Sequence, residues 1–454
     1  MADDPTATEA GSAPGDDHAL PSRRNAYYSL FVLTIVVMFT VLDRQILGLM
    51  IEPIKADFGI SDTDAALLLG AAFALPYAIV GMPIARLADT GNRRNLVAAC
   101  IAFWSTATMA CGFAQNYFQM ILARLGIGAG ESGYGPATWS IVTDSFPREK
   151  VAFGTGTLAI GATVGSGLAL FLGGAILSYV EHMPAVSLPF GGVMRSWQWA
   201  FIIVGFPGLI WALVVLSTRE PGRRGETRGK KQSVPVREVA AFMRDNWRVF
   251  LAVIGGLCMK MLMGVGANQW MPTLYYREFG WKLSEVGLII GGMTLVVAPI
   301  ALITGAKISE RWMRRGSPDA NLRIVLYGLL CSVPIAIVMP LMPSPWMVLT
   351  LQAATLFLAS LGTGPGIASF QIVTPNRMRA QVSSVYQFST HVIALAIGPL
   401  VVALFTDYLF GDSQHLKYSL SLCAAVLGPV TIIVVLMGLK PYARAYERAV
   451  REGY

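Results

Sequence analysis

The sequence predicts an all-α membrane protein with twelve transmembrane helices in two pseudo-symmetric bundles of six, and with both termini in the cytoplasm. Composition is the first reason: of 454 residues, 54% are hydrophobic and only 14% are charged. In a soluble globular domain about a quarter of the residues are charged, so this charged fraction is low. The mean hydropathy of +0.55 is correspondingly too high for such a domain. The other reasons are a series of long apolar runs and an internal repeat.

Each apolar run is close to the length that crosses a bilayer, because about 20 helical residues span a hydrocarbon core of about 30 Å. The runs cover residues 27–51, 64–87, 95–114, 117–143, 151–180, 199–217, 248–276, 284–306, 322–342, 346–373, 380–406 and 417–439.

The orientation of these runs follows from Lys and Arg, which are retained on the cytoplasmic side of a membrane. Basic residues gather at Arg23 and Arg24, in 86–94, at Arg148 and Lys150, in 219–248, in 307–323, at Arg377 and Arg379, and in the tail from Lys440. The connections that alternate with these carry almost none, so both termini are expected in the cytoplasm. This topology explains most of the net charge of +8, and no nucleic-acid partner is expected.

The spans divide the chain into five parts. They are a disordered cytoplasmic arm (1–26), an N-terminal six-helix bundle (27–217), a cytoplasmic linker with an amphipathic helix (218–247), a C-terminal six-helix bundle (248–439) and a cytoplasmic tail helix (440–454). The arm is rich in Pro, Gly and Asp without an apolar stretch. The linker and the tail alternate apolar and basic residues at helical spacing. The cysteines and histidines lack metal-ligand spacing, so no metal site is expected.

The two halves contain matching loops. ARLADTGNRR at 85–94 aligns without a gap against AKISERWMRR at 306–315, and each joins the second and third spans of its half. This charge pattern resembles that of the major facilitator superfamily, in which two six-helix bundles surround a midplane site. The resemblance implies a cytoplasmic gate made by Asp89, Arg93, Arg94, Glu310 and Arg311. Alternatively, the arginines serve only to keep these loops in the cytoplasm. That alternative does not explain why Asp89 and Glu310 occupy equivalent positions in the two halves.

A narrower resemblance rests on the first and fourth runs. LDRQ at 42–45 and GAGESGYGPAT at 128–138 are similar to the Spinster group of facilitators. That resemblance implies export of a sphingolipid- or lysophospholipid-like amphiphile, driven in bacteria by protons. It also implies that the protein is located in the bacterial inner membrane.

Four charges lie deep inside these two runs. Such a charge costs about 2.5–3.5 kcal/mol on insertion scales, so it usually faces the bundle interior and a partner. Arg124 and Glu131 are seven residues apart and share one helix face, roughly with Tyr134 and Thr138. Adjacent residues point about 100° apart, so Asp43 and Arg44 need different partners. We expect an Arg44–Glu131 pair and an Asp43–Arg124 pair.

One carboxylate of this network is expected to carry the coupling proton. Burial favours the protonated form and a nearby guanidinium favours the ionised form, so a small movement can switch protonation. Arg stays charged throughout. We therefore predict proton coupling at Asp43 or Glu131, while Arg44 and Arg124 bind an anionic headgroup or hold the carboxylate. A static salt bridge that fixes helix register is the alternative.

The second half contributes fewer candidates. Asn268, Gln269 and Trp270 precede Pro272, which frees backbone carbonyls and predicts a broken helix that lines the cavity or forms an outer gate. GTGPG at 362–366 should bend the tenth run similarly.

Two titratable side chains complete the set. Lys260 either reaches the cavity or snorkels toward the membrane surface. His391 lies well inside the eleventh run and is a candidate for the substrate site, and its unperturbed pKa near 6.5 would also suit a proton switch. A hydrogen bond from His391 to a neighbouring helix is the alternative.

We expect a monomeric secondary transporter that works by alternating access, with a lipid-like amphiphile as substrate, membrane lipids as surroundings, and no cofactor beyond the coupling proton. A proton-coupled symporter of small organic anions and a non-transporting membrane receptor are the alternatives. An enzyme acting on lipids is disfavoured, because no nucleophile, base and orienting group occur together.

Overall fold

The protein is represented by a computed structural model that describes residues 20–454, except 148–149, 185, 188–192, 224–233 and 453–454. Most of the predicted arm, 1–26, lies outside the described residues. The predicted C-terminal end of the arm at residue 26 is corrected, because the first helix already begins at Arg23. Ser22 is the N-cap of that helix, and its hydroxyl accepts a hydrogen bond from the Asn25 amide.

The first group of helices comprises α1 (Arg23–Phe58), α2 (Asp62–Leu69), α3 (Ala71–Thr90), α4 (Arg93–Cys111), α5 (Tyr117–Glu131), α6 (Tyr134–Ser145), α7 (Val151–Val180) and α8 (Ser196–Leu216). Between α7 and α8, β1 (Val186–Ser187) pairs antiparallel with β2 (Val193–Met194) in register Val186 to Met194. The sequence did not predict this hairpin.

The linker contains α9 (Val236–Asp245). The second group comprises α10 (Trp247–Phe250), the π-helix η2 (Leu251–Gly255), α11 (Gly256–Phe279), α12 (Leu283–Arg314), α13 (Ala320–Val338), the 3-10 helix η3 (Met339–Leu341), α14 (Pro345–Leu361), α15 (Thr363–Ile372), α16 (Arg379–Ser389), the π-helices η4 (Thr390–Leu395) and η5 (Phe405–Phe410) on either side of α17 (Ala396–Leu404), the 3-10 helix η6 (Ser413–His415), and α18 (Leu416–Glu452).

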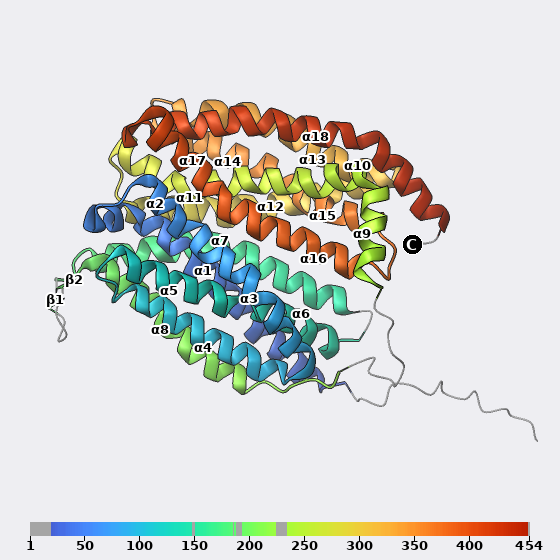
Figure 1. Cartoon of the computed structure of the whole chain (residues 1–454), viewed down its shortest axis with the longest axis horizontal. Helices are drawn as coiled ribbons and strands as arrows, with labels where there is room; N and C mark the ends of the chain where they lie inside the picture. The colour runs from blue at the N-terminus through green and yellow to red at the C-terminus, as the bar shows by residue number, and fades with distance from the viewer. Residues whose placement is uncertain (1–19, 148–149, 185, 188–192, 224–233, 453–454) are drawn as a thin grey trace, which may run out of the picture.

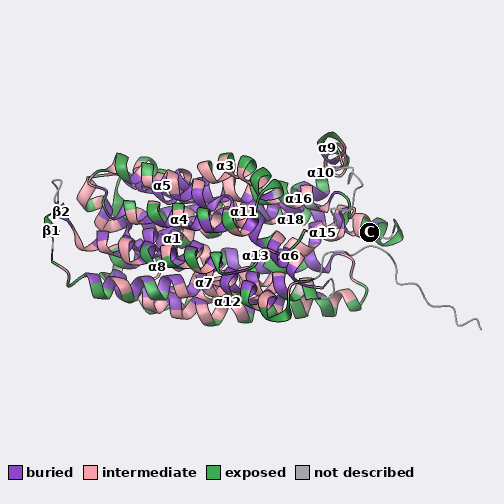
Figure 2. Cartoon of the chain, turned by 90° about the horizontal axis from the view of Figure 1, so that it is seen from below, coloured by how far each residue is buried: buried purple, intermediate pink, exposed green. Residues whose placement is uncertain are grey.

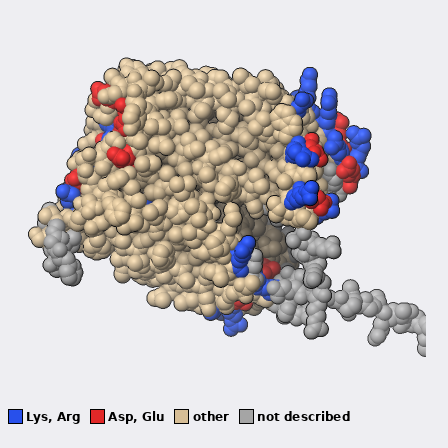
Figure 3. Space-filling model, in the orientation of Figure 1, with Lys and Arg blue, Asp and Glu red and all other residues tan. Residues whose placement is uncertain are grey.

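The two groups lie side by side with their long axes roughly parallel (Figure 1). We call the end that carries β1 and β2 the hairpin end, and the end that carries α9 and the last turns of α18 the tail end. Figure 3 shows Lys, Arg, Asp and Glu gathered at these two ends, with a broad belt without visible charge between them. Such a belt is what a hydrocarbon environment requires of the surface.

Ten helical segments among the described residues are long and apolar enough to cross a membrane. The expected third and fourth spans are not among them. α4 begins with Arg93, Arg94 and Asn95, and the fourth span is divided into α5 and α6 by a turn at Ser132 and Gly133. The predicted tail helix is a continuation of α18, which runs without interruption to Glu452.

Of the two predicted helix breaks, one is confirmed and one is wrong. Gly362 separates α14 from α15, as the GTGPG stretch indicates. Pro272 does not break its helix, because α11 continues from Gly256 to Phe279. A buried membrane helix tolerates proline when the surrounding helices hold its position.

Glycines allow α7 of the first group and α12 of the second to touch along their backbones. A Cβ atom on Gly174 would lie 2.5 Å from the Ser284 carbonyl oxygen, and one on Gly291 would lie 2.3 Å from the Phe171 nitrogen. Small residues are the usual means of close helix approach in membranes.

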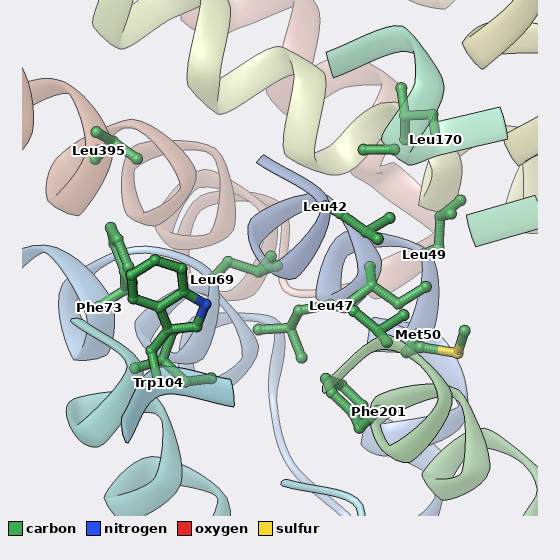
Figure 4. Packing of buried hydrophobic residues seen from close by; sticks show 14 of the residues in the cluster. Leu42, Leu47, Leu49, Met50, Leu69, Phe73, Trp104, Leu170, Phe201 and Leu395 are labelled. Atoms are coloured by element: carbon green, nitrogen blue, oxygen red, sulfur yellow. The ribbon is translucent and has the colours of Figure 1, made fainter. Parts of the chain in front are cut away.

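The core runs along the middle of both groups, whereas exposed residues cover the outside (Figure 2). Many exposed residues are large and apolar, such as Ile79, Leu213 and Met437, which suits a surface in contact with lipid. Inside, Trp104 and Phe73 lie close to Leu69, and Leu42 and Leu47 project from α1 (Figure 4). This packing surrounds the deep charges of α1 and α5.

Candidate functional site

The candidate site is a cluster of buried charges between α1 and α5. Asp43, Arg124 and Glu131 are 3%, 1% and 0% exposed, and Arg44 retains 22% of its side-chain surface. Asp43 and Arg44 lie in the middle of α1, Arg124 lies in the middle of α5, and Glu131 is the last residue of α5.

The predicted pair of Arg44 with Glu131 is confirmed. Arg44 Nε donates to Glu131 Oε2 at 3.0 Å, and Nη2 donates to the same oxygen at 2.5 Å. Glu131 Oε1 is buried without a hydrogen-bond partner. The carboxylate is therefore held by one of its two oxygens.

The predicted pair of Asp43 with Arg124 is wrong. Among the described residues, Asp43 Oδ1 and Arg124 Nη1 are buried without hydrogen-bond partners, and Arg124 Nε donates to the Leu68 carbonyl oxygen at 3.2 Å. Asp43 nevertheless lies in the field of Glu131 and Arg124. The reason is the packing of α5 on α3. A Cβ atom on Gly128 would lie 2.2 Å from the Phe73 carbonyl oxygen, so this close contact fixes the rotation of α5 and with it the direction of Arg124.

Two aromatic residues of α3, Phe73 and Tyr77, lie beside the guanidinium groups of the cluster. Arg44 Cζ lies 4.4 Å from the Phe73 ring centroid, and Arg124 Cζ lies 5.8 Å from it. Tyr77 follows one turn later and lies 5.7 Å from Arg44 Cζ. Sequence reasoning missed both aromatic residues. Their spacing of four on one helix face was a signal, but aromatic residues are common in any membrane core.

His391 of the second group lies beside these aromatic residues. Its ring stacks on Tyr77 with centroids 4.5 Å apart, and its Nδ1 is 2.8 Å from the Gln387 carbonyl oxygen. Its predicted role in substrate binding stays a prediction.

Tyr134 and Thr138 lie on α6, beyond the turn that ends α5. The Tyr134 hydroxyl is 3.2 Å from Thr40 Oγ1, and the Tyr134 ring contacts Trp104 edge-on at 5.5 Å. Thr138 Oγ1 is buried without a hydrogen-bond partner. The turn at Ser132 and Gly133 shifts these residues out of the straight stripe that the sequence suggested.

A cavity of about 460 Å³ lies mainly within the second group. Helices α11 to α15 and α18 supply most of its wall, and α7 contributes Ser166 and Leu170. The wall is mostly apolar and includes Met261, Met263, Met271, Met293 and Met339. The four clustered charges do not line it, although Gln45, next to Arg44, donates to Ser166 at 3.3 Å.

The predicted residues of the seventh span separate in the structure. Asn268 lines the cavity. Gln269 is buried, and its side chain contacts Gly48 of α1. Trp270 is fully buried outside the cavity wall and donates its indole N–H to the Pro399 carbonyl oxygen at 3.0 Å. A buried indole needs such a partner, and α17 supplies it. The assignment of Trp270 to the substrate site stays a prediction.

The predicted gate residues of the first half hold helices of their own group together. Arg93 donates to Asp144, to Glu220 at 2.7 Å and to the Pro221 carbonyl oxygen at 2.8 Å, which joins α4, α6 and the segment after α8. Arg94 donates to the Thr218 carbonyl oxygen at 3.2 Å. The side chain of Asp89 lies outside the described part of the chain.

In the second half, Glu310 pairs with Arg314 one turn away on α12 at 2.5 Å, and Arg311 is exposed. These contacts stay within single groups, and the gate itself stays a prediction.

Charged side chains connect the two groups at the hairpin end, by contacts that the sequence did not predict. Arg277 of α11 donates to Glu52 at 2.7 Å and to Asp62 Oδ1 at 2.6 Å. Thr63 donates to Asp407 from its amide at 2.7 Å and from its hydroxyl at 2.6 Å. We call Arg277 with Glu52 and Asp62 the hairpin-end clamp.

The chain matches the Major Facilitator Superfamily over residues 33–399. It belongs to that superfamily. An MFS-type efflux pump of Mycolicibacterium smegmatis is 27% identical, over 93% of this chain and 94% of that one. A sphingosine-1-phosphate transporter of Mus musculus is 22% identical, over 92% and 78%. A D-galactonate transporter of Escherichia coli is 24% identical, over 93% and 98%.

Among solved structures, a bacterial homologue of the human lysosomal transporter Spinster, in an inward-facing and unoccupied conformation, superimposes with a TM-score of 0.75. It is 25% identical, and the match covers 95% of this chain and 99% of that one. The resemblance to the Spinster group is thereby confirmed. As a major facilitator, the chain is an integral multi-pass transport protein rather than an enzyme.

Proposed function

We propose that this major facilitator is a proton-coupled secondary transporter of a sphingolipid- or lysophospholipid-like amphiphile, working by alternating access in a bacterial inner membrane. Its twelve spans form two six-helix bundles (27–217 and 248–439), with the arm, linker and tail in the cytoplasm. The single observation that carries the proposal is the buried carboxylate pair, in which Arg44 holds Glu131 while Asp43 Oδ1 has no donor.

Proton coupling at Asp43 and Glu131 follows from the cost of burying charge. An ionised carboxylate with one buried oxygen that no donor meets is costly in a low-dielectric interior, and a proton removes that cost. A shift of α1 against α5 breaks the Arg44–Glu131 pair, after which Glu131 accepts a proton and Arg44 becomes available to an anion. Arg124 keeps the local field positive in both states.

The amphiphile is supported by the apolar cavity of the second group, together with the relationship to a sphingosine-1-phosphate transporter. A chain of methylene groups fits a wall of methionine and leucine, while a charged head needs a polar partner. Asn268, Tyr134, Thr138 and His391 are the proposed polar contacts along the path between the cavity and the charged cluster.

Alternating access is supported by the distribution of contacts between the two groups. The hairpin-end clamp and the Thr63–Asp407 contact tie the groups together at one end. We assign Asp89, Arg93, Arg94, Glu310 and Arg311 to the gate that closes the tail end in the opposite state.

The test is proton flux in proteoliposomes that contain a pH-sensitive dye. A lysophospholipid added to wild-type protein should move protons, and D-galactonate should not. Asp43→Asn and Glu131→Gln should abolish the proton flux, whereas Asp245→Asn, an exposed acid on α9, should leave it unchanged. Unaltered flux in both Asp43→Asn and Glu131→Gln would exclude coupling at this cluster.

A symporter of small organic anions is the second candidate. The relationship to a D-galactonate transporter favours it, since two guanidinium groups near Phe73 would suit a carboxylate substrate. Proton flux with D-galactonate and none with the lysophospholipid would support this candidate instead.

A further inference from the structure

Lys260 is a cation inside the cavity of the second group. Its amine donates to Thr363 Oγ1 at 3.2 Å, at the point where α14 gives way to α15. Lys260 lies 13 residues beyond Trp247, the first residue of α10, or about 20 Å along the helix axis. The amine is therefore held at mid-helix by the neighbouring span and does not snorkel to the membrane surface.

No acid neutralises this amine within the described part of the chain. Its hydrogen-bond partner is a hydroxyl, and no charged group among the described residues lies close enough to act on Lys260. Of the described side chains that line the cavity, Lys260 alone carries a charge. An unpaired cation at this depth is costly, so its presence indicates a partner that arrives from outside the chain.

The rest of the cavity wall is mostly apolar, with a few neutral polar side chains such as Asn268 and Gln352. On α11 this wall runs from Leu257 to Met271, which is about 21 Å of helix. Beyond the amine the wall is formed by side chains such as Met271, Met339 and Leu420. One positive end and a long apolar remainder match a molecule with one anionic head and one hydrocarbon chain. The volume of about 460 Å³ falls in the range of ordinary ligand sites.

The basic residues of the first group are placed differently. Arg44 is engaged by Glu131, and Arg124 is almost fully buried beside Leu68 and Phe73, so neither faces the cavity. We propose that Lys260 binds the anionic head, a phosphate or a carboxylate, of a single-chain amphiphile whose chain fills the cavity of the second group. The inference rests on the proposed transport function and assigns its anion site to the half of the molecule opposite the proton site.

The experiment measures equilibrium binding of three tritiated lipids to the full-length protein in nanodiscs by scintillation proximity. Oleoyl lysophosphatidic acid carries a phosphate, oleate carries a carboxylate, and monooleoylglycerol is neutral. The variants are Lys260→Met, which keeps the apolar stem, and Lys260→Arg, which keeps the charge. Lys307→Met removes an exposed lysine of α12 and is the matched control.

Lys260→Met should weaken binding of the anionic lipid by about tenfold or more, which corresponds to about 1.4 kcal/mol, because a charge-assisted contact is lost. Binding of monooleoylglycerol should change by less than about twofold. Lys260→Arg should stay close to wild type, and Lys307→Met should equal it. If Lys260→Met weakens binding of lysophosphatidic acid more than binding of oleate, the site prefers a phosphate head. The reverse order indicates a preference for a carboxylate head.

Equal affinity of Lys260→Met and wild type for both anionic lipids would overturn the inference. So would an equal loss for the neutral lipid, an Arg variant as weak as the Met variant, or a wild-type protein that binds none of the three lipids. Lys260-dependent binding together with no proton flux in wild-type proteoliposomes would support the anion site and refute the proposed coupling. Failure of the anion site and failure of the proposed proton coupling therefore give different results.

Discussion

Tyr77 of α3 and His391 of η4 stack face to face across the boundary between the two groups of helices, with ring planes 4° apart. Because Tyr77 also lies over the Arg44 guanidinium, the stack connects the second group to the charged cluster of the first. A movement of one group against the other must separate these rings or carry them together.

We expect Tyr77 and His391 to be energetically coupled. A stacked aromatic pair contributes about 0.5–1.5 kcal/mol beyond the burial of its area. The single variants Tyr77→Leu and His391→Leu, together with the double variant, should give a coupling free energy in this range from thermal unfolding in detergent. His182→Leu, at an exposed position near the hairpin end, provides a comparison. Strictly additive effects of the two substitutions would contradict the coupling.

The hairpin-end clamp should control the separation of the two groups at that end. Arg277→Gln removes the charge that both Glu52 and Asp62 contact, so the groups should separate more often. Spin labels at the exposed positions Phe118 and Tyr408 should then show a longer mean distance by electron paramagnetic resonance. Lys417→Met breaks an ion pair with Glu278 inside the second group and should leave that distance unchanged. An unaltered distance in Arg277→Gln would show that the clamp does not hold this end.

Removing one member of the Arg44–Glu131 pair should destabilise the protein strongly. Arg44→Met leaves Glu131, which is fully buried, without its hydrogen-bond donor, and breaking a buried pair costs about 3–5 kcal/mol. The double variant Arg44→Met/Glu131→Met should recover much of this loss, because no unpaired charge remains. Thermal unfolding of the three proteins checks this order, and a double variant less stable than Arg44→Met would reverse our interpretation.

Two adjacent glycines of α12 should respond differently to alanine. Gly291 faces the backbone of α7, so Gly291→Ala forces the helices apart at a cost of about 1–3 kcal/mol. Gly292 has open space around its Cα, so Gly292→Ala should be neutral or slightly stabilising, since alanine favours helix. The melting temperatures of the two variants make the comparison directly. Equal melting temperatures would mean that the α7–α12 contact tolerates an added methyl group.

The sequence was sufficient for the features that depend on helix geometry alone. The positions of Arg44 and Glu131 along their helices predicted their contact, and GTGPG predicted the break at Gly362. The Asp43–Arg124 pair was mispredicted because depth along a helix does not fix rotation, which the fit of Gly128 on Phe73 determines. Pro272 was mispredicted because proline breaks a helix only where the neighbouring packing permits it.

Other parts of the site carry no distinctive pattern in the sequence. Arg277 and its acidic partners lie at the ends of spans, where charges are common for reasons of topology alone. Phe73 and Tyr77 resemble any other aromatic residues of a membrane core. The methionine-rich cavity is built from six or more helices that meet only in three dimensions, so no local run of residues reveals it.

The uninterrupted course of α18 from Leu416 to Glu452 has a mechanical consequence. Its 37 residues make a rod about 56 Å long, almost twice the thickness of a hydrocarbon core of about 30 Å. Pro429 and Pro441 lie within α18 without ending it, so a pivoting of the second group is carried outward along the helix and is largest at its tip. A fluorophore attached at Arg451 would follow each turnover of the carrier as a swing of that tip.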